Sequence, residues 1–473
     1  MKNLFALQRL KIVQFAIAMA IFIGIKNEFV LAYQHSNVLN LVPIEDATHV
    51  ASTSGDWSDD GVWAGNPPTT AARVVIPQGV TVTVDLVNAL EFKTIRVDGI
   101  LNFATDRNTE LRVDTLVTTM TGELVIGTAT SPIQSDVTAR IVFSDDGPID
   151  TTWDPAIISR GALLMGATTM HGAAKTAFVS SEGASQGASQ IALSEVPAGW
   201  RVNDTLCITG VEPNNPSSDE LVSLESGVGS PLINLDSTLE RSHLTPRSDL
   251  EIHVANLTRN IQFESENTSH RHRGHMMIMH GNNVDIRYVS FQGMGRTDKS
   301  IDLEDWRLIS GSETSICPDD TIVESLNGFN VRGRYSVHFH RGGFGGQPNV
   351  VQGTVVRDDL GWAYVNHSSN VDFLDNVSHN VIGAAYNTEA GDELGSFVRN
   401  IAIRTVNPDG NPNPPDDEIV FEQSPDIRVL TQDFGWQGDG FWFHGSGVTV
   451  DDNVVSGASG HGFIYWTLGL VER

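Results

Sequence analysis

The sequence is poor in cysteine and in positive charge. Its 473 residues include 2 cysteines, and 58 Asp and Glu stand against 30 Lys and Arg. This excess of negative charge excludes nucleic acid as a partner, because binding to phosphates requires a net cationic surface. An anionic polysaccharide would need a local cationic patch or a bridging divalent cation. Cys207 and Cys317 are compatible with a disulfide or with two separate buried thiols.

Long apolar runs are also missing after the N-terminus. The run at residues 12–25 follows Lys2, Arg9 and Lys11, and residues 30–32 offer a small residue for cleavage. We therefore expect residues 1–32 to be a signal peptide, with an uncleaved anchor helix as the alternative. Because no later segment is apolar enough to cross a bilayer, the sequence predicts a secreted or cell-surface protein without membrane insertion.

Five short stretches in the last third of the chain align without gaps and carry an aromatic residue in the fourth position. They are residues 336–340, 361–365, 383–387, 440–444 and 462–466. Two of the intervals between them are 22 residues, a period that fits one coil of a parallel β-helix. With 44 glycines and few charged residues, the composition favours an all-β protein.

Alternation along a strand places the second and fourth positions of each stretch on one face, and both are apolar in every copy. We expect this face to line the solenoid core. The third and fifth positions then point outward, as His338/His340, Ala363/Val365, Ala385/Asn387, Trp442/His444 and Ile464/Trp466. Indole and imidazole groups on an exposed sheet are typical of a sugar-binding groove. The predicted substrate-binding residues are His338, Arg341, Asn387, Trp442, His444 and Trp466.

Changes in the residue pattern along the sequence predict a division into segments. After a signal peptide at 1–32 and a linker at 33–55, short strands bounded by turn residues predict a β-rich domain at 56–185. A strand-rich connection at 186–270 and a right-handed parallel β-helix at 271–473 follow. The last residues end inside a coil without a polar cap, as expected of a truncated piece or of an end that dimerises.

Several motifs resemble the family of proteins with an eight-glycine domain, which includes the cell migration-inducing and hyaluronan-binding protein, a transmembrane cell-surface hyaluronidase and fibrocystin. In the domain itself the resemblance rests on residues 57–58, 63–65, 75–82, 97–101 and 122–124. Beyond it, the resemblance continues through residues 200–204, 254–261, 274–279, 294–295, 333–340 and 388–391. Asn203, Ser336 and Ala390 depart from the usual Gly, Pro and Asp of these motifs. The resemblance implies a hyaluronan-like substrate, although fibrocystin shares the domain without known glycan cleavage.

Candidate catalytic residues are Glu389, Asp439 and His340. Glu389 lies two residues beyond Asn387 with the same outward parity, and it falls in the segment that resembles T-E-D-G. Glycoside hydrolysis requires two carboxyl groups about 5 to 9.5 Å apart. Other carboxylates that could supply the pair are Asp392, Glu393 and Asp433. A lyase would instead use His340 as base, with Arg341 or Arg334 to neutralise charge.

Metal binding has weaker support in the sequence. His338 and His340 lie on the same side of a strand and could share a metal ion, but the sequence does not place a third ligand. We therefore assign no metal ligands. Residues 409–418 space oxygen ligands as a calcium loop does, but they lack the glycine and the terminal ligand of an EF-hand, so Ca²⁺ is the one cofactor considered.

The sequence thus predicts an extracellular protein that binds and degrades a polysaccharide, by hydrolysis or by lyase chemistry. The alternative is a non-catalytic glycan-binding or adhesion module. An enzyme needs a close pair of carboxylates on the outward face, whereas a binding module needs only the aromatic and imidazole groups.

Overall fold

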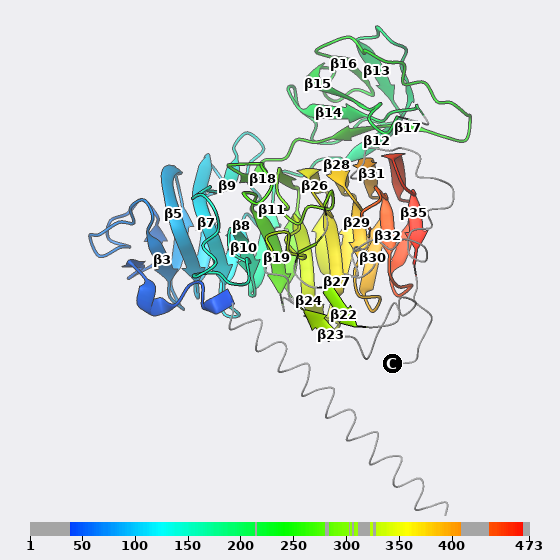
Figure 1. The fold of residues 1–473 in the computed structure, drawn as a ribbon. Helices are drawn as coiled ribbons and strands as arrows, with labels where there is room; N and C mark the ends of the chain where they lie inside the picture. Colours follow the sequence, from blue (N-terminus) through cyan, green and yellow to red (C-terminus); the bar gives the residue numbers. More distant parts are fainter. Residues whose placement is uncertain are drawn as a thin grey trace, which may run out of the picture.

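The computed structural model describes residues 38–212, 215–279, 283–301, 303–304, 307–310, 322–324, 328–407 and 435–466. Their regular structure is almost entirely β-strand, and η1 (Ile44–Asp46) is a short 3₁₀ helix. Most strands pair in parallel with the strand one coil away, as in a β-helix (Figure 1). The expected fold class, all-β with a parallel β-helix, is confirmed.

Three parallel faces make up the β-helix. The first face, in order, consists of β1 (His49–Val50), β3 (Arg73–Ile76), the second half of β5 (Val87–Val97), the second half of β7 (Thr109–Thr118), β10 (Gly161–Leu164), β19 (His275–Met279), β24 (Val337–Gly343), the first half of β27 (Tyr364–Leu374), β29 (Tyr386–Thr388), β32 (Phe441–Phe443) and β35 (Phe463–Tyr465). This face carries the candidate site.

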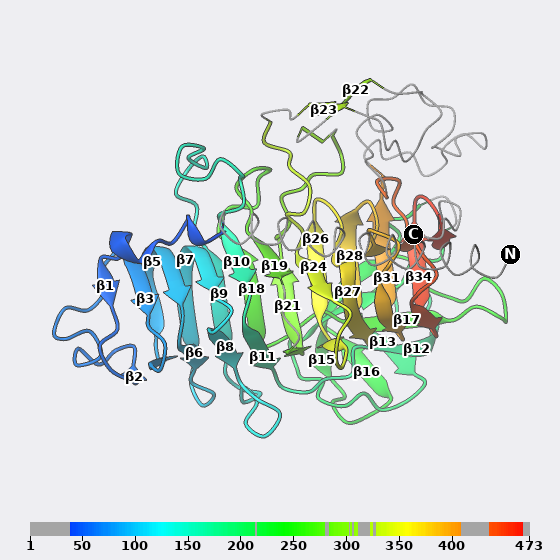
Figure 2. The same cartoon turned by 90° about the horizontal axis from the view of Figure 1, so that it is seen from below.

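The other two faces complete each coil. The second consists of β2 (Gly55–Asp56), β4 (Thr81–Val84), β6 (Ile100–Phe103), β8 (Glu123–Ile126), β11 (Ala167–His171), β20 (Val284–Arg287), β25 (Asn349–Gln352), the second half of β27, β30 (Leu394–Val398) and β33 (Thr449–Asp451). The third consists of the first halves of β5 and β7, then β9 (Ala139–Phe143), β18 (Ile261–Ser265), β21 (Val289–Gln292), β26 (Val355–Asp359), β28 (Val377–Ile382), β31 (Ile401–Val406) and β34 (Val454–Ala458). The antiparallel pair β22 (Arg307–Ser310) and β23 (Ile322–Glu324) lies beside the coils (Figure 2).

A six-stranded antiparallel barrel is inserted between β11 and β18 (Figure 1). It consists of β12 (Phe178–Gly183), β13 (Gln190–Leu193), β14 (Thr205–Ile208), β15 (Glu220–Ser226), β16 (Leu232–Leu235) and β17 (Ile252–Asn256). The barrel has its own apolar core around Trp200 and Leu206. Its outer surface packs on the third face of the β-helix through a cluster that includes Cys207, Val377 and Ile401.

The structure corrects the expected segment boundaries. Residues 56–185 do not form a separate domain before the β-helix, because β1 to β11 pair in parallel as its first coils. The expected connection at 186–270 is mostly the inserted barrel. The described part of the expected linker packs instead of hanging free, with Val38, Leu41 and Val42 buried against the first face at Met277 and Met279. The expected signal peptide at 1–32 lies outside the described residues.

Aromatic side chains stack along the inside of the first face. The ring centroids of Tyr364 and Tyr386 are 4.8 Å apart, those of Tyr386 and Phe441 4.5 Å, and those of Phe441 and Phe463 4.8 Å. This spacing follows the distance between paired strands. The expected inward parity is confirmed, because Phe339, Tyr386 and Phe443 are fully buried in the main core.

The register differs from the gapless alignment by two residues in two stretches. Tyr364 and Tyr386 pair with Val337 and Phe441, and not with the aromatic residues Phe339 and Phe443. The reason is that β27 and β29 start at the fourth residue of their stretches, whereas β24, β32 and β35 start at the second. A shift of two preserves which side chains point inward but changes which outward residues are neighbours.

Candidate functional site

A row of polar side chains crosses the outer side of the first face where β24, β27 and β29 lie side by side. The register pairs His340 with His367. The register of β27 with β29 then brings Glu389, which follows the last residue of β29, next to His367. His338 precedes His340 by two residues and points to the same side. We call these four residues the histidine–glutamate cluster.

The cluster is compact and mostly buried. Nitrogen atoms of the three histidines lie within 4.8 Å of one another. Glu389 Oε2 is 3.2 Å from His367 Nδ1 and 3.6 Å from His338 Nε2. The side chain of His338 is 1% exposed, whereas those of His367 and Glu389 are 15% and 16% exposed. Solvent therefore reaches the cluster from the His367 and Glu389 end.

Several polar atoms of the cluster have no hydrogen-bond partner among the residues that the structure describes. These atoms are His338 Nε2, His340 Nδ1, His367 Nδ1 and Glu389 Oε2. Buried polar groups are nearly always hydrogen-bonded, and leaving one unsatisfied costs about 1 to 3 kcal/mol. Four such atoms in one compact cluster, two of them forming the 3.2 Å ion pair of His367 with Glu389, indicate a site adapted to something other than its own internal contacts.

Burial and mutual charge shift the pKa values of the cluster. Burial lowers the pKa of His338 to about 4 and also lowers that of His340, so both imidazoles are neutral at pH 7. Burial alone would raise the pKa of Glu389, but the interaction with His367 lowers it below its ordinary value. For His367, the nearby Glu389 carboxylate outweighs burial and raises the pKa. An ionised carboxylate and neutral imidazoles can accept protons or bind a cation.

A buried carboxylate holds the loop after Glu389 in place. Glu393 accepts hydrogen bonds from the backbone N–H groups of Ser368, Ala390 and Gly391. Burial raises its pKa. Since Ser368 follows His367 and Ala390 follows Glu389, these bonds fix two members of the cluster relative to each other. Glu393, one of the alternative carboxylates considered above, therefore positions the cluster.

The expected solvent exposure is wrong for three predicted binding residues. Asn387 and Trp442 are fully buried, and His338 is 1% exposed. Trp442 stacks on Trp362, whose ring in turn stacks on Tyr335, because the corner residues before β24 and β27 fold over this side of the sheet. Trp442 thus belongs to a second apolar cluster on the outside of the first face.

The remaining predicted binding residues border the cluster. The ring Nδ1–H of His444 donates to the backbone carbonyl of Glu389 at 2.7 Å, and the rings of His444 and Trp466 stack with centroids 5.3 Å apart. Arg341 follows His340, is exposed, and has a φ of +54°. Their contact with a glycan stays a prediction.

The other candidate carboxylate, Asp439, does not belong to the row. It is fully buried before β32, and its carboxylate accepts hydrogen bonds from the backbone N–H and the ring of His461, at 2.8 and 3.1 Å. Arg334 is also bound elsewhere, to the backbone carbonyls of Ala156 and Ile157. The calcium-loop residues and Asp433 lie outside the described residues.

His367 was missed by sequence reasoning. The gapless alignment placed Val365 and Asn387 opposite His340, so the position that pairs with His340 was given to the wrong residues. Shifting the second and third stretches by two places would have aligned His340 with His367 and Glu389. The signal was that each of these residues lies two places beyond an outward position.

A second group of titratable side chains lies where the barrel meets the β-helix. Asp219 accepts hydrogen bonds from His379 at 2.9 Å and from Arg404 at 2.7 and 2.8 Å. The thiol of Cys207 lies 3.6 Å from the same carboxylate. We call these four residues the interface cluster. Burial raises the pKa of Cys207, which is a free thiol; Cys317 lies outside the described residues.

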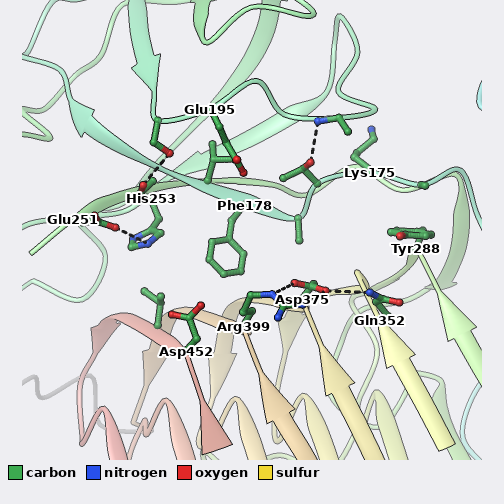
Figure 3. Close-up of a pocket in the computed structure, with 18 residues that line it drawn as sticks. Lys175, Phe178, Glu195, Glu251, His253, Tyr288, Gln352, Asp375, Arg399 and Asp452 are labelled. Atoms are coloured by element: carbon green, nitrogen blue, oxygen red, sulfur yellow. Dashed lines mark hydrogen bonds and ion pairs between the residues drawn. The ribbon is translucent and has the colours of Figure 1, made fainter.

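A cavity of about 520 Å³ opens between the barrel and the coils (Figure 3). Several of its polar side chains interact with one another. Arg399 bonds to Asp375 at 2.8 Å, Gln352 bonds to the same carboxylate at 3.1 Å, and His253 lies 3.9 Å from Glu251. Arg399, Asp375 and Gln352 are thus bonded to one another without a ligand.

Two family models match the chain in the order expected from its motifs. The G8 domain matches residues 62–181, and the CEMIP beta-helix matches residues 325–469. The chain belongs to the G8/CEMIP-like family. The CEMIP beta-helix match contains the complete histidine–glutamate cluster, and the G8 match contains most of the first coils. No curated protein matches the chain in sequence.

Solved structures similar to the chain include three phage tailspikes. They are gp61 of Pseudomonas phage phi297 (11% identity, TM-score 0.17), gp49 of Pseudomonas phage LKA1 (8%, 0.17), and Gp54 of Acinetobacter baumannii bacteriophage AP22 in complex with capsular saccharide (9%, 0.18). The matches cover 78%, 80% and 85% of this chain, and 66%, 55% and 67% of the tailspike chains. TM-scores this low carry no argument about function. Within the described residues, no helix is long and apolar enough to cross a membrane.

Proposed function

We propose that the chain is an extracellular protein that binds and cleaves a polysaccharide, with the histidine–glutamate cluster as its reaction centre. The observation that carries the proposal is the set of four unsatisfied polar atoms, gathered from three adjacent strands on one face. Membership of the G8/CEMIP-like family supports a glycan as the substrate class, and a hyaluronan-like polymer is our first candidate.

The cluster has groups for proton transfer, and its single carboxylate, Glu389, favours lyase chemistry over the two-carboxyl mechanism of glycoside hydrolases. Hydrolysis and lyase cleavage both require proton transfer by positioned side chains, most often imidazole or carboxylate. Glu389 supplies the carboxylate, and His340 and His367 supply imidazoles at the end of the cluster that solvent reaches. Arg341, which is exposed directly after His340, is positioned to contact an anionic sugar.

A panel of polysaccharides tests the proposal. The protein is incubated with hyaluronan, chondroitin, pectin and neutral glucans, and products are followed by size-exclusion chromatography and by reducing-end assay. We expect one polymer to be shortened, and Glu389→Gln to reduce the rate by at least about 100-fold. The matched control is Asp375→Asn, an acidic side chain on another face that pairs with Arg399.

The products also distinguish a lyase from a hydrolase, and an enzyme from a non-catalytic binding module. Unsaturated sugar ends would indicate a lyase, and saturated ends a hydrolase. A polymer that binds without new ends would assign the chain to the non-catalytic binding modules. If Glu389→Gln cleaved as fast as the unaltered protein, the cluster would not be the reaction centre.

A further inference from the structure

We propose that the histidine–glutamate cluster binds one divalent first-row transition-metal ion, with Zn²⁺ as the ion for the test, through His338, His340, His367 and Glu389. Three imidazoles and one carboxylate are a ligand set that Zn²⁺ and its neighbours in the first row accept. This proposal concerns what the cluster binds, and it holds whether or not the chain cleaves a glycan.

The hydrogen bond of His338 to Gly333 determines which ring nitrogen carries a lone pair, and this nitrogen faces the cluster. Its Nδ1 lies 2.9 Å from the carbonyl oxygen of Gly333, which can only accept, so Nδ1 carries the proton. Nε2 is then the atom with the lone pair, and this atom is directed at Glu389 without a hydrogen-bond partner in the described structure. A metal-binding histidine typically donates its other ring N–H in this way.

The distances suit coordination better than direct hydrogen bonding. Four ligands at the usual Zn–N and Zn–O lengths of about 2.0 to 2.2 Å lie about 3.3 to 3.6 Å from one another in a tetrahedron. Glu389 Oε2 is 3.2 Å from His367 Nδ1 and 3.6 Å from His338 Nε2. The three histidines, with nitrogens within 4.8 Å of one another, need to close by about 1 Å or less on an ion.

The donor atoms also decide against calcium. Ca²⁺ takes six to eight oxygen ligands, whereas the cluster offers three nitrogens and one carboxylate. The loop at 409–418 that suggested calcium in the sequence lies outside the described residues. We therefore expect selectivity for Zn²⁺ over Ca²⁺ at this site.

The interface cluster is the rival site within the described residues, because Cys207, Asp219 and His379 are also close enough to share an ion. Its Asp219 carboxylate already accepts hydrogen bonds from His379 and Arg404. A bound ion would have to displace these bonds and would lie beside a permanently charged guanidinium. In the histidine–glutamate cluster an ion would displace weaker contacts, from Glu389 Oε2 to His367 Nδ1 at 3.2 Å and to His338 Nε2 at 3.6 Å, and no described guanidinium is hydrogen-bonded to Glu389.

The test measures metal content and affinity with the full chain. The protein is stripped with EDTA, desalted, exposed to Zn²⁺ or Ca²⁺, desalted again and analysed by inductively coupled plasma mass spectrometry. We expect about one Zn²⁺ and no Ca²⁺ per chain. His340→Asn and His367→Asn should each weaken Zn²⁺ binding by at least about 100-fold in competition with a chromophoric chelator, since changes of outer-shell partners alone cost 10- to 100-fold. The matched control is His49→Asn, a surface histidine that bonds to Thr48.

X-ray absorption of the loaded unaltered protein keeps the test valid if a variant fails to fold. A shell of nitrogen and oxygen at about 2.0 to 2.1 Å with imidazole scattering supports the proposal, whereas sulfur at about 2.3 Å places the ion at Cys207 and overturns it. Absence of tight Zn²⁺ binding, or binding unchanged in both histidine variants, also overturns it. Metal binding without glycan cleavage would refute the proposed function alone, and cleavage by metal-free protein would refute only the metal.

Discussion

The two buried clusters of titratable side chains in this chain differ in how far their polar atoms are satisfied. In the interface cluster, both oxygens of Asp219 accept hydrogen bonds, from His379 and Arg404. In the histidine–glutamate cluster, Glu389 Oε2 and three imidazole nitrogens have no hydrogen-bond partner in the described structure. Similar residue types and similar burial thus produce a closed network in one place and an open one in the other.

The difference follows from what surrounds each cluster. Asp219 is enclosed between the barrel and the third face, where an unsatisfied carboxylate would cost several kcal/mol. The histidine–glutamate cluster lies on one continuous face, reaches solvent at Glu389, and touches the apolar cluster of Trp442 and Trp362 where the ring of Tyr335 contacts His338. A satisfied network holds parts of a fold together, and an unsatisfied network that solvent can reach is available to a ligand.

Breaking the closed network should have the largest effect. Asp219→Ala removes an acceptor that Arg404 and His379 share at the interface, and it leaves a permanently charged guanidinium partly buried. We expect the free energy of unfolding to fall by about 3 to 5 kcal/mol, measured by urea denaturation. Asp285→Ala, whose carboxylate pairs with His171 and Arg287 nearer the surface, should cost less than about 1 kcal/mol. Equal losses for both would remove the contrast between closed and open networks.

Disrupting the apolar cluster that touches the open cluster should cost nearly as much. Trp442→Ala deletes a fully buried indole that packs on Trp362, and we expect a loss of about 3 to 5 kcal/mol in unfolding free energy. Phe443→Ala, on the core side of the same strand, should cost a similar amount. Thermal denaturation of the two variants provides the comparison. A stable Trp442→Ala with a destabilised Phe443→Ala would show that Trp442 faces solvent.

The β-helix could be predicted from sequence because its signal is repeated. The 22-residue interval and the inward aromatic positions are properties of single strands, and parity survives a register error of two residues. The register itself could not be predicted, because glycines mark the corners and not the first residue of each strand: β27 starts at Tyr364, three residues after Gly361, whereas β32 starts directly after Gly440.

The site could be predicted only in part for the same reason. The alternation of side chains along a strand predicts that His338, His340 and Glu389 share one face, but placing His367 beside them requires the correct register. The burial of Trp442 depends on Tyr335 and Trp362 folding over the sheet, a tertiary contact with no local signature. The barrel could not be predicted, because antiparallel pairing between distant strands such as β12 and β17 leaves no periodic pattern in the sequence.

Asp359 should have an intermediate effect on stability, and this effect should depend on pH. Burial raises its pKa from 3.8 to about 7, although Ser336, the backbone N–H of Gly361 and the charge of Arg273 oppose the shift. The folded state therefore keeps a proton that the unfolded chain loses, so this group makes stability fall between about pH 4 and pH 7, by up to about 1.4 kcal/mol per pH unit. Asp359→Asn should flatten this part of the profile in urea titrations at several pH values. An unchanged slope would contradict the assignment of a protonated Asp359.

The smallest effect on stability is expected at Glu389. Glu389→Gln preserves volume and removes a buried negative charge whose Oε2 atom has no hydrogen-bond partner within the described residues. It leaves behind imidazoles, which carry no permanent charge, and not a guanidinium as at Arg404. We expect the unfolding free energy of the chelator-treated protein to fall by about 1 kcal/mol, because an imidazole that loses its carboxylate partner can release its proton and stay neutral, which a guanidinium cannot do. The same urea experiment on Asp219→Asn should show a clearly larger loss. If Glu389→Gln lost as much as Asp219→Asn, Glu389 would be part of a structural network, and the open cluster would need its carboxylate for folding.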